Sequence, residues 1–230
     1  MKTKKIKKGL IDKYLQVEAK SIVFVGDFNP VIIQPFWLAN KKLIREEEAI
    51  NAKIDVIHNE LVKYSLDWAD IEINKFRCEF RTSKSPYFEP LKDLAVNVFR
   101  ILKETPIRQL GINHIYDFSL VNQKKMYDFG NRLCPLNMWN ESLEKPRVLH
   151  VEVQEPKRRD GKNGVVRVRV TPSDKKIDFG VTININDHYD LGTDERGTNL
   201  EIVKILEENW STSNKRVSEI IENLFTKLEL

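Results

Sequence analysis

The sequence predicts an α+β fold of two pseudo-repeated halves, in each of which helices cover an antiparallel sheet. The first half reads as a hydrophobic strand that ends at Asp27-Phe28, then an apolar helix, paired strands and an amphipathic helix over residues 87–103. The same order of elements follows in the second half, where Asp117-Phe118 stands at the equivalent place. Because both series run strand, helix, strands, helix, we expect the two halves to superpose.

The predicted boundaries give a basic N-terminal tail at residues 1–14, a first half at 15–106 and a second half at 107–230. A chain of 230 residues with 41% hydrophobic residues can bury one large core or two fused half-cores, which excludes wholesale disorder. The lysine-rich start lacks interleaved aromatic residues and arginines, so a solvated tail is favoured over a nucleic-acid-binding arm.

Two patterns in the first half predict paired strands. Apolar and polar residues alternate over 61–68, and a change of phase near residue 69 predicts a bulge or a bend. Cys78 then alternates with Phe76 and Phe80, which predicts a strand with these three side chains facing inward.

The helix that closes the first half is predicted from apolar residues at helical spacing, which Pro106 ends. One apolar face should pack onto the sheet. The residues that form this face are Phe88, Leu91, Leu94, Ala95, Val98, Ile101 and Leu102.

The second half predicts three antiparallel strands with one dry and one polar face, because apolar and polar residues alternate over 149–154, 166–170 and 179–186. Residues 160–164 supply a hairpin turn. A closing helix should follow the capping candidates Ser211 and Ser213, and its apolar stripe should cover the dry face.

Catalytic and metal sites are not apparent in the sequence. It has no nucleophile elbow, phosphate loop or dinucleotide-binding glycine pattern, so enzymatic activity is left open but disfavoured. The four histidines lie in separate elements, and residues 187–190, the one dense group, read better as a loop at a strand end than as metal ligands. We therefore expect no catalytic, metal or cofactor residues and no cofactor, although a site assembled in space stays possible.

The compartment follows from the cysteines and from hydropathy. Cys78 and Cys134 lack CxxC spacing, which favours a reduced, cytoplasmic protein. The basic start is not followed by an uninterrupted apolar run, so neither export nor a membrane partner is expected.

The most suggestive surface is the polar face of the second sheet, with a basic strip at its hairpin. Residues 145–176 contain ten Lys or Arg against four acids. Guanidinium groups on a rigid strand suit phosphates or carboxylates, whereas a solvated face on which Glu152 pairs with an arginine is the simpler interpretation. The candidate anion-binding or partner-binding residues are Arg167, Arg169, Lys157, Arg158, Arg159 and Lys162. The other polar residues on this face are His150, Glu152, Gln154, Thr182, Asn184 and Asn186.

The order of elements resembles the tandem organisation of TATA-box-binding-protein-like and helix-grip folds, and a SecB-like sheet with a covering helix. The segments 21–30, 36–38 and 109–118 are similar to those of an uncharacterised, sporadically distributed bacterial protein family of about this length. The resemblance covers nearly all of the chain after about residue 15. It implies an accessory role in a mobile-element or phage-defence gene cluster, and no activity.

The sequence therefore predicts a non-catalytic binding or adaptor protein of the bacterial cytosol, with a protein as the favoured partner. A nucleic-acid binder that uses the basic sheet face and hairpin is the first alternative. A small-molecule binder, or an enzyme with a spatially assembled site, is the second.

Overall fold

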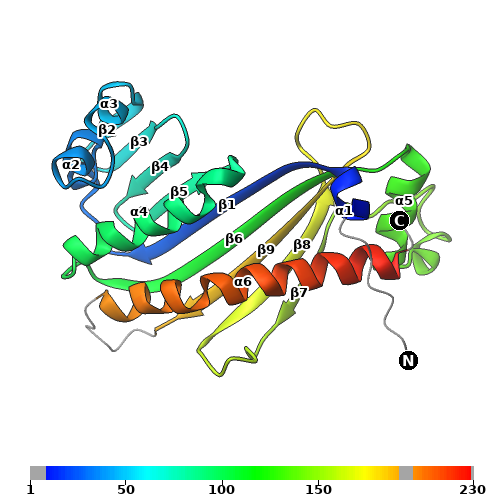
Figure 1. Ribbon diagram of the computed structural model, residues 1–230. Helices are drawn as coiled ribbons and strands as arrows, with labels where there is room; N and C mark the ends of the chain where they lie inside the picture. Colours follow the sequence, from blue (N-terminus) through cyan, green and yellow to red (C-terminus); the bar gives the residue numbers. More distant parts are fainter. Residues whose placement is uncertain (1–8, 192–198, 229–230) are drawn as a thin grey trace.

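The computed structural model describes residues 9–191 and 199–228 of the chain (Figure 1). Its centre is one nine-stranded sheet in which every pair of neighbours is antiparallel, in the order β2-β3-β4-β5-β1-β6-β9-β8-β7. The strands are β1 (Leu15–Gly26), β2 (Lys53–His58), β3 (Leu61–Ser65), β4 (Asp70–Asn74), β5 (Arg77–Thr82), β6 (Ile107–Ser119), β7 (Val151–Glu155), β8 (Gly164–Pro172) and β9 (Gly180–Asp190).

The predicted α+β class with antiparallel pairing is confirmed, but the prediction of a separate sheet in each half is wrong. The long strands β1 and β6 pair from Leu15 opposite Phe118 to Gly26 opposite Ile107, and this joins the two sets of strands into one sheet. Two separate sheets would each leave one of these long strands as an unpaired edge, and pairing them satisfies the backbone of both.

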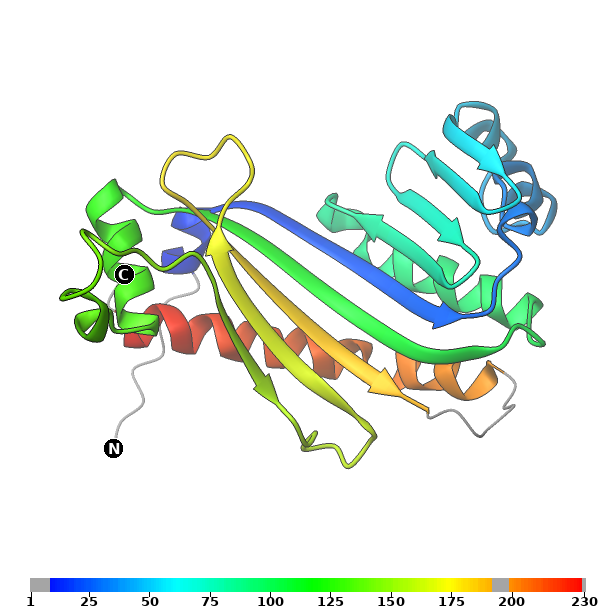
Figure 2. The same ribbon diagram turned by 180° about the vertical axis from the view of Figure 1, so that it is seen from behind.

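The helices form a single layer on one side of the sheet. They are α1 (Gly9–Tyr14), α2 (Pro35–Asn40), α3 (Glu46–Ile50), α4 (Phe88–Ile101), α5 (Gln123–Leu133) and α6 (Leu200–Lys227). Figure 2, seen from behind, shows strands β5, β1, β6, β9 and β8 in front of α4 and α6, and no described helix crosses them. No helix of residues 9–191 and 199–228 therefore covers the opposite face of the sheet, which we call the uncovered face.

Two apolar cores lie between the sheet and the helices. The first gathers β3, β4, β5 and parts of β1 and β6 with α2, α3, α4 and the first part of α6 up to Trp210. The second gathers the ends of β6, β8 and β9 with α5 and the later part of α6 from Val217. Helix α6 thus belongs to both cores, which explains why it is long.

The helix predicted over residues 87–103 is confirmed as α4, and Leu91, Leu94 and Val98 are buried as expected. Ile101, which was expected on the apolar face, is 41% exposed. Phe99, which was not expected there, is fully buried and packs edge-on against Phe24, with 4.5 Å between the ring centroids.

Two local predictions are wrong, and a third is decided between its two alternatives. Helix α6 begins at Leu200, so Ser211 and Ser213 lie inside it and do not cap it. Residues 187–190 belong to β9 and do not form a loop. Of the two alternatives predicted for the change of phase near residue 69, the bend is confirmed: the chain turns tightly between β3 and β4, where Leu66 N donates to Ala69 O.

Other findings concern the edges of the fold. Cys78 and Phe80 face inward as predicted, whereas Phe76 lies in the turn before β5 and is 66% exposed. Residues 1–8 of the predicted basic tail lie outside the described residues, and residues 9–14 form α1. No helix in the described part of the chain has both the length and the apolar character needed to cross a membrane.

Candidate binding face

The uncovered face carries one unbroken row of polar side chains that crosses all nine strands. Residues that stand directly opposite one another in antiparallel pairs share a face, so the strand registers place these side chains in line. We call this set the central polar row. From β2 to β7 its members are Lys53, Ser65, Asp70, Arg81, Ser21, Asn113, Asn186, Arg167 and Gln154.

Amide and hydroxyl groups form the middle of the row. Asn186 Nδ2 donates to Asn113 Oδ1 at 2.5 Å, and Asn113 Nδ2 donates to Ser21 Oγ at 3.3 Å. The Oδ1 atoms of Asn184 and Asn186 are buried and accept no hydrogen bond from the described residues. An acceptor without a donor is costly when it is shielded from water, so these two oxygens mark an unmet hydrogen-bonding requirement beneath the surface of this face.

Gly111 makes room for this arrangement. It lies on β6 opposite His188, two residue pairs along from Asn113 and Asn186 and therefore on the same face. A Cβ atom at Gly111 would stand 3.1 Å from Asn186 Nδ2, closer than a methyl group and an amide nitrogen comfortably approach. The missing side chain therefore lets the Asn186 amide lie over the strand.

Two arginines flank the amide centre of the row. Arg81, on β5, is exposed and makes no hydrogen bond or ion pair with the described residues. Arg167, on β8, uses Nε to bind Gln154 Oε1 at 2.8 Å and has no carboxylate partner in the described part of the chain. Four strand spacings separate β5 from β8, which puts the backbones at Arg81 and Arg167 about 19 Å apart.

The other predicted surface cations are mostly paired. Arg169 Nη2 lies 2.6 Å from Glu152 Oε2, which confirms the expected pair on this face. The remaining pairs are Arg159 with Glu155 at 3.0 Å and Lys162 with Glu208 at 3.8 Å, and exposed Lys157 has no partner among the described residues. The basic strip is therefore interleaved with acids, and only part of its charge is free.

Arg158 was predicted as a surface cation and is buried instead, with 3% of its area exposed. Its guanidinium binds Asp160 Oδ2 at 2.5 Å, binds Asp187 Oδ1, and lies 3.8 Å from the centroid of the Tyr189 ring. Asp187 also accepts a hydrogen bond from Arg216 Nη1, on α6, at 2.5 Å. This network ties the β7–β8 hairpin to β9 and α6, so Arg158 cannot meet a partner at the surface.

Asp117 fixes the end of the uncovered face. It is fully buried on β6 and accepts hydrogen bonds from Thr182 Oγ1 at 2.5 Å, from Ser173 Oγ at 2.9 Å and from Lys175 Nζ. Burial alone would raise the pKa of this carboxyl, but the hydrogen bonds from Lys175, Thr182 and Ser173 outweigh it and lower the pKa. Asp117 thus holds the β8–β9 connection against the sheet.

A second polar cluster lies on the covered face, near where the two cores part. His114 Nε2 lies 3.0 Å from Ser213 Oγ, and both side chains are fully buried. Across from His114 on β1, Lys20 Nζ donates to Asn214 Oδ1 at 2.5 Å. Burial, with a smaller effect from the charge of Lys20, lowers the pKa of His114 to about 3. A shielded, neutral histidine of such low basicity is not suited to general-base catalysis, so we interpret the histidine–serine pair as part of the core.

The stability of the protein is expected to fall on acidification through His114. Its pKa is about 3 when folded and near 6.5 when unfolded, so between these values the unfolded chain binds the extra proton and stability rises with pH. From about pH 7 to about pH 5 the loss should reach about 2 kcal/mol. Urea denaturation of the wild type and of His114→Gln at both pH values measures it. The free energy of unfolding of His114→Gln should fall by about 2 kcal/mol less on acidification than that of the wild type. Equal losses in the two proteins would contradict the prediction.

Metal ligands do not cluster in residues 9–191 and 199–228, where no three His, Cys, Asp or Glu side chains come together as a metal site requires. The sequence-predicted residues that the structure brings together are Arg167, Arg169 and the polar residues of β7 and β9. Those missed by the sequence are Ser21, Asn113 and Arg81, whose alignment depends on the pairing of β5, β1, β6 and β9. The chain matches no protein-family model and no curated protein sequence.

Proposed function

We propose that this chain is a non-catalytic binding protein whose uncovered sheet face binds a protein partner through the central polar row. The observation that carries the proposal is the row itself, since it is continuous over nine strands and holds two exposed arginines that have no carboxylate partner among the described residues. A rigid sheet presents these groups with little loss of side-chain freedom on binding. Arg81 and Arg167 would each pair with an acidic group of the partner, and the amide centre would take its hydrogen bonds.

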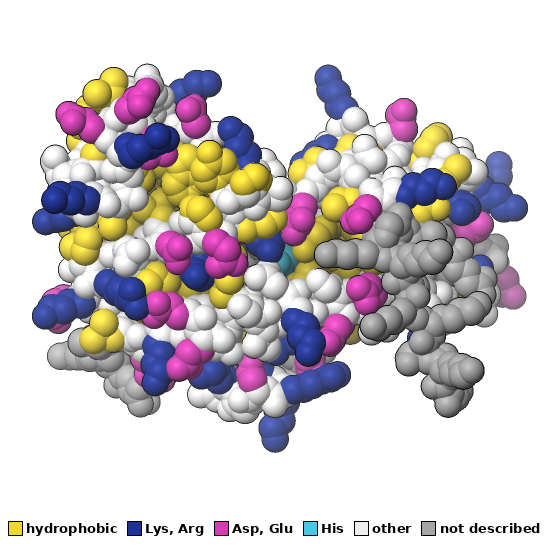
Figure 3. All heavy atoms as spheres, in the orientation of Figure 1, with side chains coloured by type: hydrophobic (Ala, Val, Ile, Leu, Met, Phe, Trp, Pro, Cys, Tyr) yellow, Lys and Arg dark blue, Asp and Glu magenta, His cyan; other side chains and the backbone are white. Residues whose placement is uncertain are grey.

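The distribution of charge favours a protein partner over a nucleic acid. Asp70 lies in the row beside Arg81, and Glu72 and Glu79 lie in the neighbouring row. A continuous polyanion would meet these acids as well as the arginines, whereas a protein can place one carboxylate at each arginine and leave the space between them neutral. The covered side does not favour a nucleic acid either, because Figure 3 shows Lys and Arg interspersed with Asp and Glu over it.

The proposal is tested by capture from an extract of the source cells with the tagged full chain, before and after nuclease treatment. We expect a protein partner that nuclease does not release, and at least a tenfold loss of capture for Arg81→Glu combined with Arg167→Glu. The matched control reverses two exposed lysines of the helix layer, Lys103→Glu with Lys204→Glu, which are 63% and 73% exposed. The control should capture the partner as the wild type does.

Two outcomes would count against this function. Retention of the partner by the double arginine variant would show that the polar row is not the binding surface. Recovery of DNA or RNA in place of a protein, with retention that falls steeply as salt rises, would establish the nucleic-acid alternative.

We further propose that the two halves are structural repeats. In each half the first strand pairs with the last strand of the following meander, as β1 pairs with β5 and β6 with β9, and a helix follows that last strand. The motif that suggested the repeat is not strictly equivalent, because Asp117 lies inside β6 whereas Asp27 follows β1 and binds Arg108 at 2.6 Å. The proposal predicts that α4 and α6 coincide when β1 and β5 are superposed on β6 and β9.

A further inference from the structure

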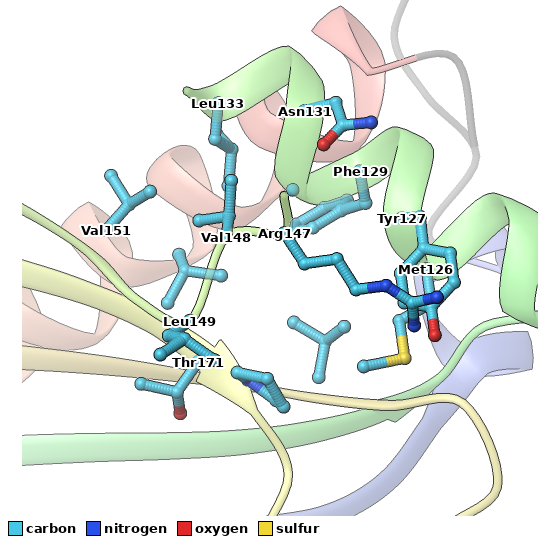
Figure 4. Close-up of a pocket in the computed structure, with 14 residues that line it drawn as sticks. Met126, Tyr127, Phe129, Asn131, Leu133, Arg147, Val148, Leu149, Val151 and Thr171 are labelled. Atoms are coloured by element: carbon cyan, nitrogen blue, oxygen red, sulfur yellow. The ribbon is translucent and has the colours of Figure 1, made fainter. Parts of the chain in front are cut away.

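A small apolar pocket lies at the far end of the covered side, away from the central polar row. It has a volume of about 120 Å³, is open to solvent on one side, and is lined by α5, by the segment that leads into β7, and by the ends of β8 and β9 (Figure 4). Its walls are mostly aliphatic and aromatic, and they include Met126, Phe129, Leu133, Val148 and Leu149. This volume suits a single apolar side chain better than an extended small molecule, since drug-sized ligands occupy several hundred Å³.

The pocket adjoins an open edge of the sheet. Strand β7 is the last strand in the sheet order, and no described strand pairs with its outer side. Along the covered side of this edge, Leu149, Val151 and Val153 alternate with polar residues, and Leu149 and Val153 are 77% and 61% exposed. Leu149 and Val151 also line the pocket. An exposed edge strand with an apolar row is a template for an added strand.

Arg147 supplies a charge at the same place. Its guanidinium carbon lies 3.9 Å from the centroid of the Tyr127 ring, and the side chain is exposed. It makes no ion pair with the described residues, and Figure 4 shows it running along the pocket towards Tyr127 and Met126. An arginine stacked on an aromatic ring keeps its outer N–H groups free for a carboxylate.

We propose that β7 and this pocket bind an extended peptide segment of a partner protein, which adds to the sheet as a tenth strand. Backbone hydrogen bonds to the free edge of β7 would hold the segment. Its side chains on the covered side would be apolar at every second position, one of them entering the pocket beside Leu149. An aspartate or glutamate of the segment would pair with Arg147. This site is separate from the central polar row and does not depend on it.

The experiment is selection from a phage-displayed library of random octapeptides on the immobilised full chain. The enriched peptides should share apolar residues at alternate positions and at least one acidic residue. The affinity of the best peptide, measured by fluorescence polarisation, should fall at least tenfold for Arg147→Glu and for Val153→Lys. Replacement of the acidic residue of the peptide by lysine should restore binding to the Arg147→Glu protein.

The matched control is Ile57→Lys on β2, the opposite edge strand, where the side chain is 47% exposed. It should leave peptide affinity unchanged. All three substitutions are at exposed positions, and equal thermal unfolding midpoints check that the variants are folded. The inference is overturned if no peptide is enriched, if Val153→Lys binds as the wild type does, or if octanoate alone shifts the methyl resonance of Met126 and no peptide competes with it.

Discussion

Replacement of Asp187 by asparagine is expected to lower the free energy of unfolding by about 3–5 kcal/mol. The carboxylate is 1% exposed and holds two guanidinium groups, those of Arg158 and Arg216. Asparagine keeps the shape but removes the negative charge. Arg158, whose side chain is fully buried, would then keep Asp160 as its one carboxylate partner among the described residues. Arg216 also lies near Asp160, at 3.6 Å, so the two guanidinium groups would share one carboxylate and one positive charge would be left uncompensated, which is the costly outcome.

Urea denaturation of the wild type and of Asp187→Asn at neutral pH measures this loss. The control is Glu152→Gln, which breaks the exposed pair with Arg169 and should change the free energy of unfolding by at most about 1 kcal/mol. If Asp187→Asn costs no more than this control, water must replace the lost carboxylate, and the network does not tie the hairpin to α6 as described.

The sequence could not predict that Arg158 is buried. The basic hairpin tip was recognised from composition, but its second acidic partner lies 29 residues further along the chain. That partner, Asp187, was interpreted as part of a loop, whereas it stands on β9 under α6. Local patterns do not show which charges meet across a sheet, so a buried cation and a solvated one look alike in sequence.

The sequence could predict only part of the central polar row, because it does not show which strands pair. The alternation in β7, β8 and β9 correctly placed Arg167, Arg169 and Asn186 on one polar face. The other half of the central polar row depends on the pairing of β1 with β5 and β6, strands that are far apart in the chain. Alternation gives the face of a strand but not the identity of its neighbour. Because the pairing of β1 with β6 could not be predicted, two sheets were expected where there is one.

Replacement of Phe99 by alanine should be about as damaging to the fold as the change at Asp187, and should cost about 3–5 kcal/mol. Phe99 is fully buried on α4, and its ring lies 4.5 Å from that of Phe24, 5.9 Å from that of Phe28 and 6.4 Å from that of Phe80. Phe24 and Phe80 stand on β1 and β5, so the ring fastens the helix to both strands. Its removal leaves a cavity among rigid neighbours that have little freedom to close it.

The matched control for this prediction is Ile101→Ala, two residues along the same helix, where the side chain is 41% exposed. Its loss should be well below that of Phe99→Ala, because less apolar surface leaves the core and no enclosed cavity forms. Chemical denaturation of both variants gives the comparison. Helical spacing had favoured Ile101 over Phe99 as a packing residue, and so the sequence pattern and the structure predict opposite orders of damage. A greater loss for Ile101→Ala would mean that α4 is rotated about its axis relative to the orientation described, and that the aromatic cluster is not the centre of the first core.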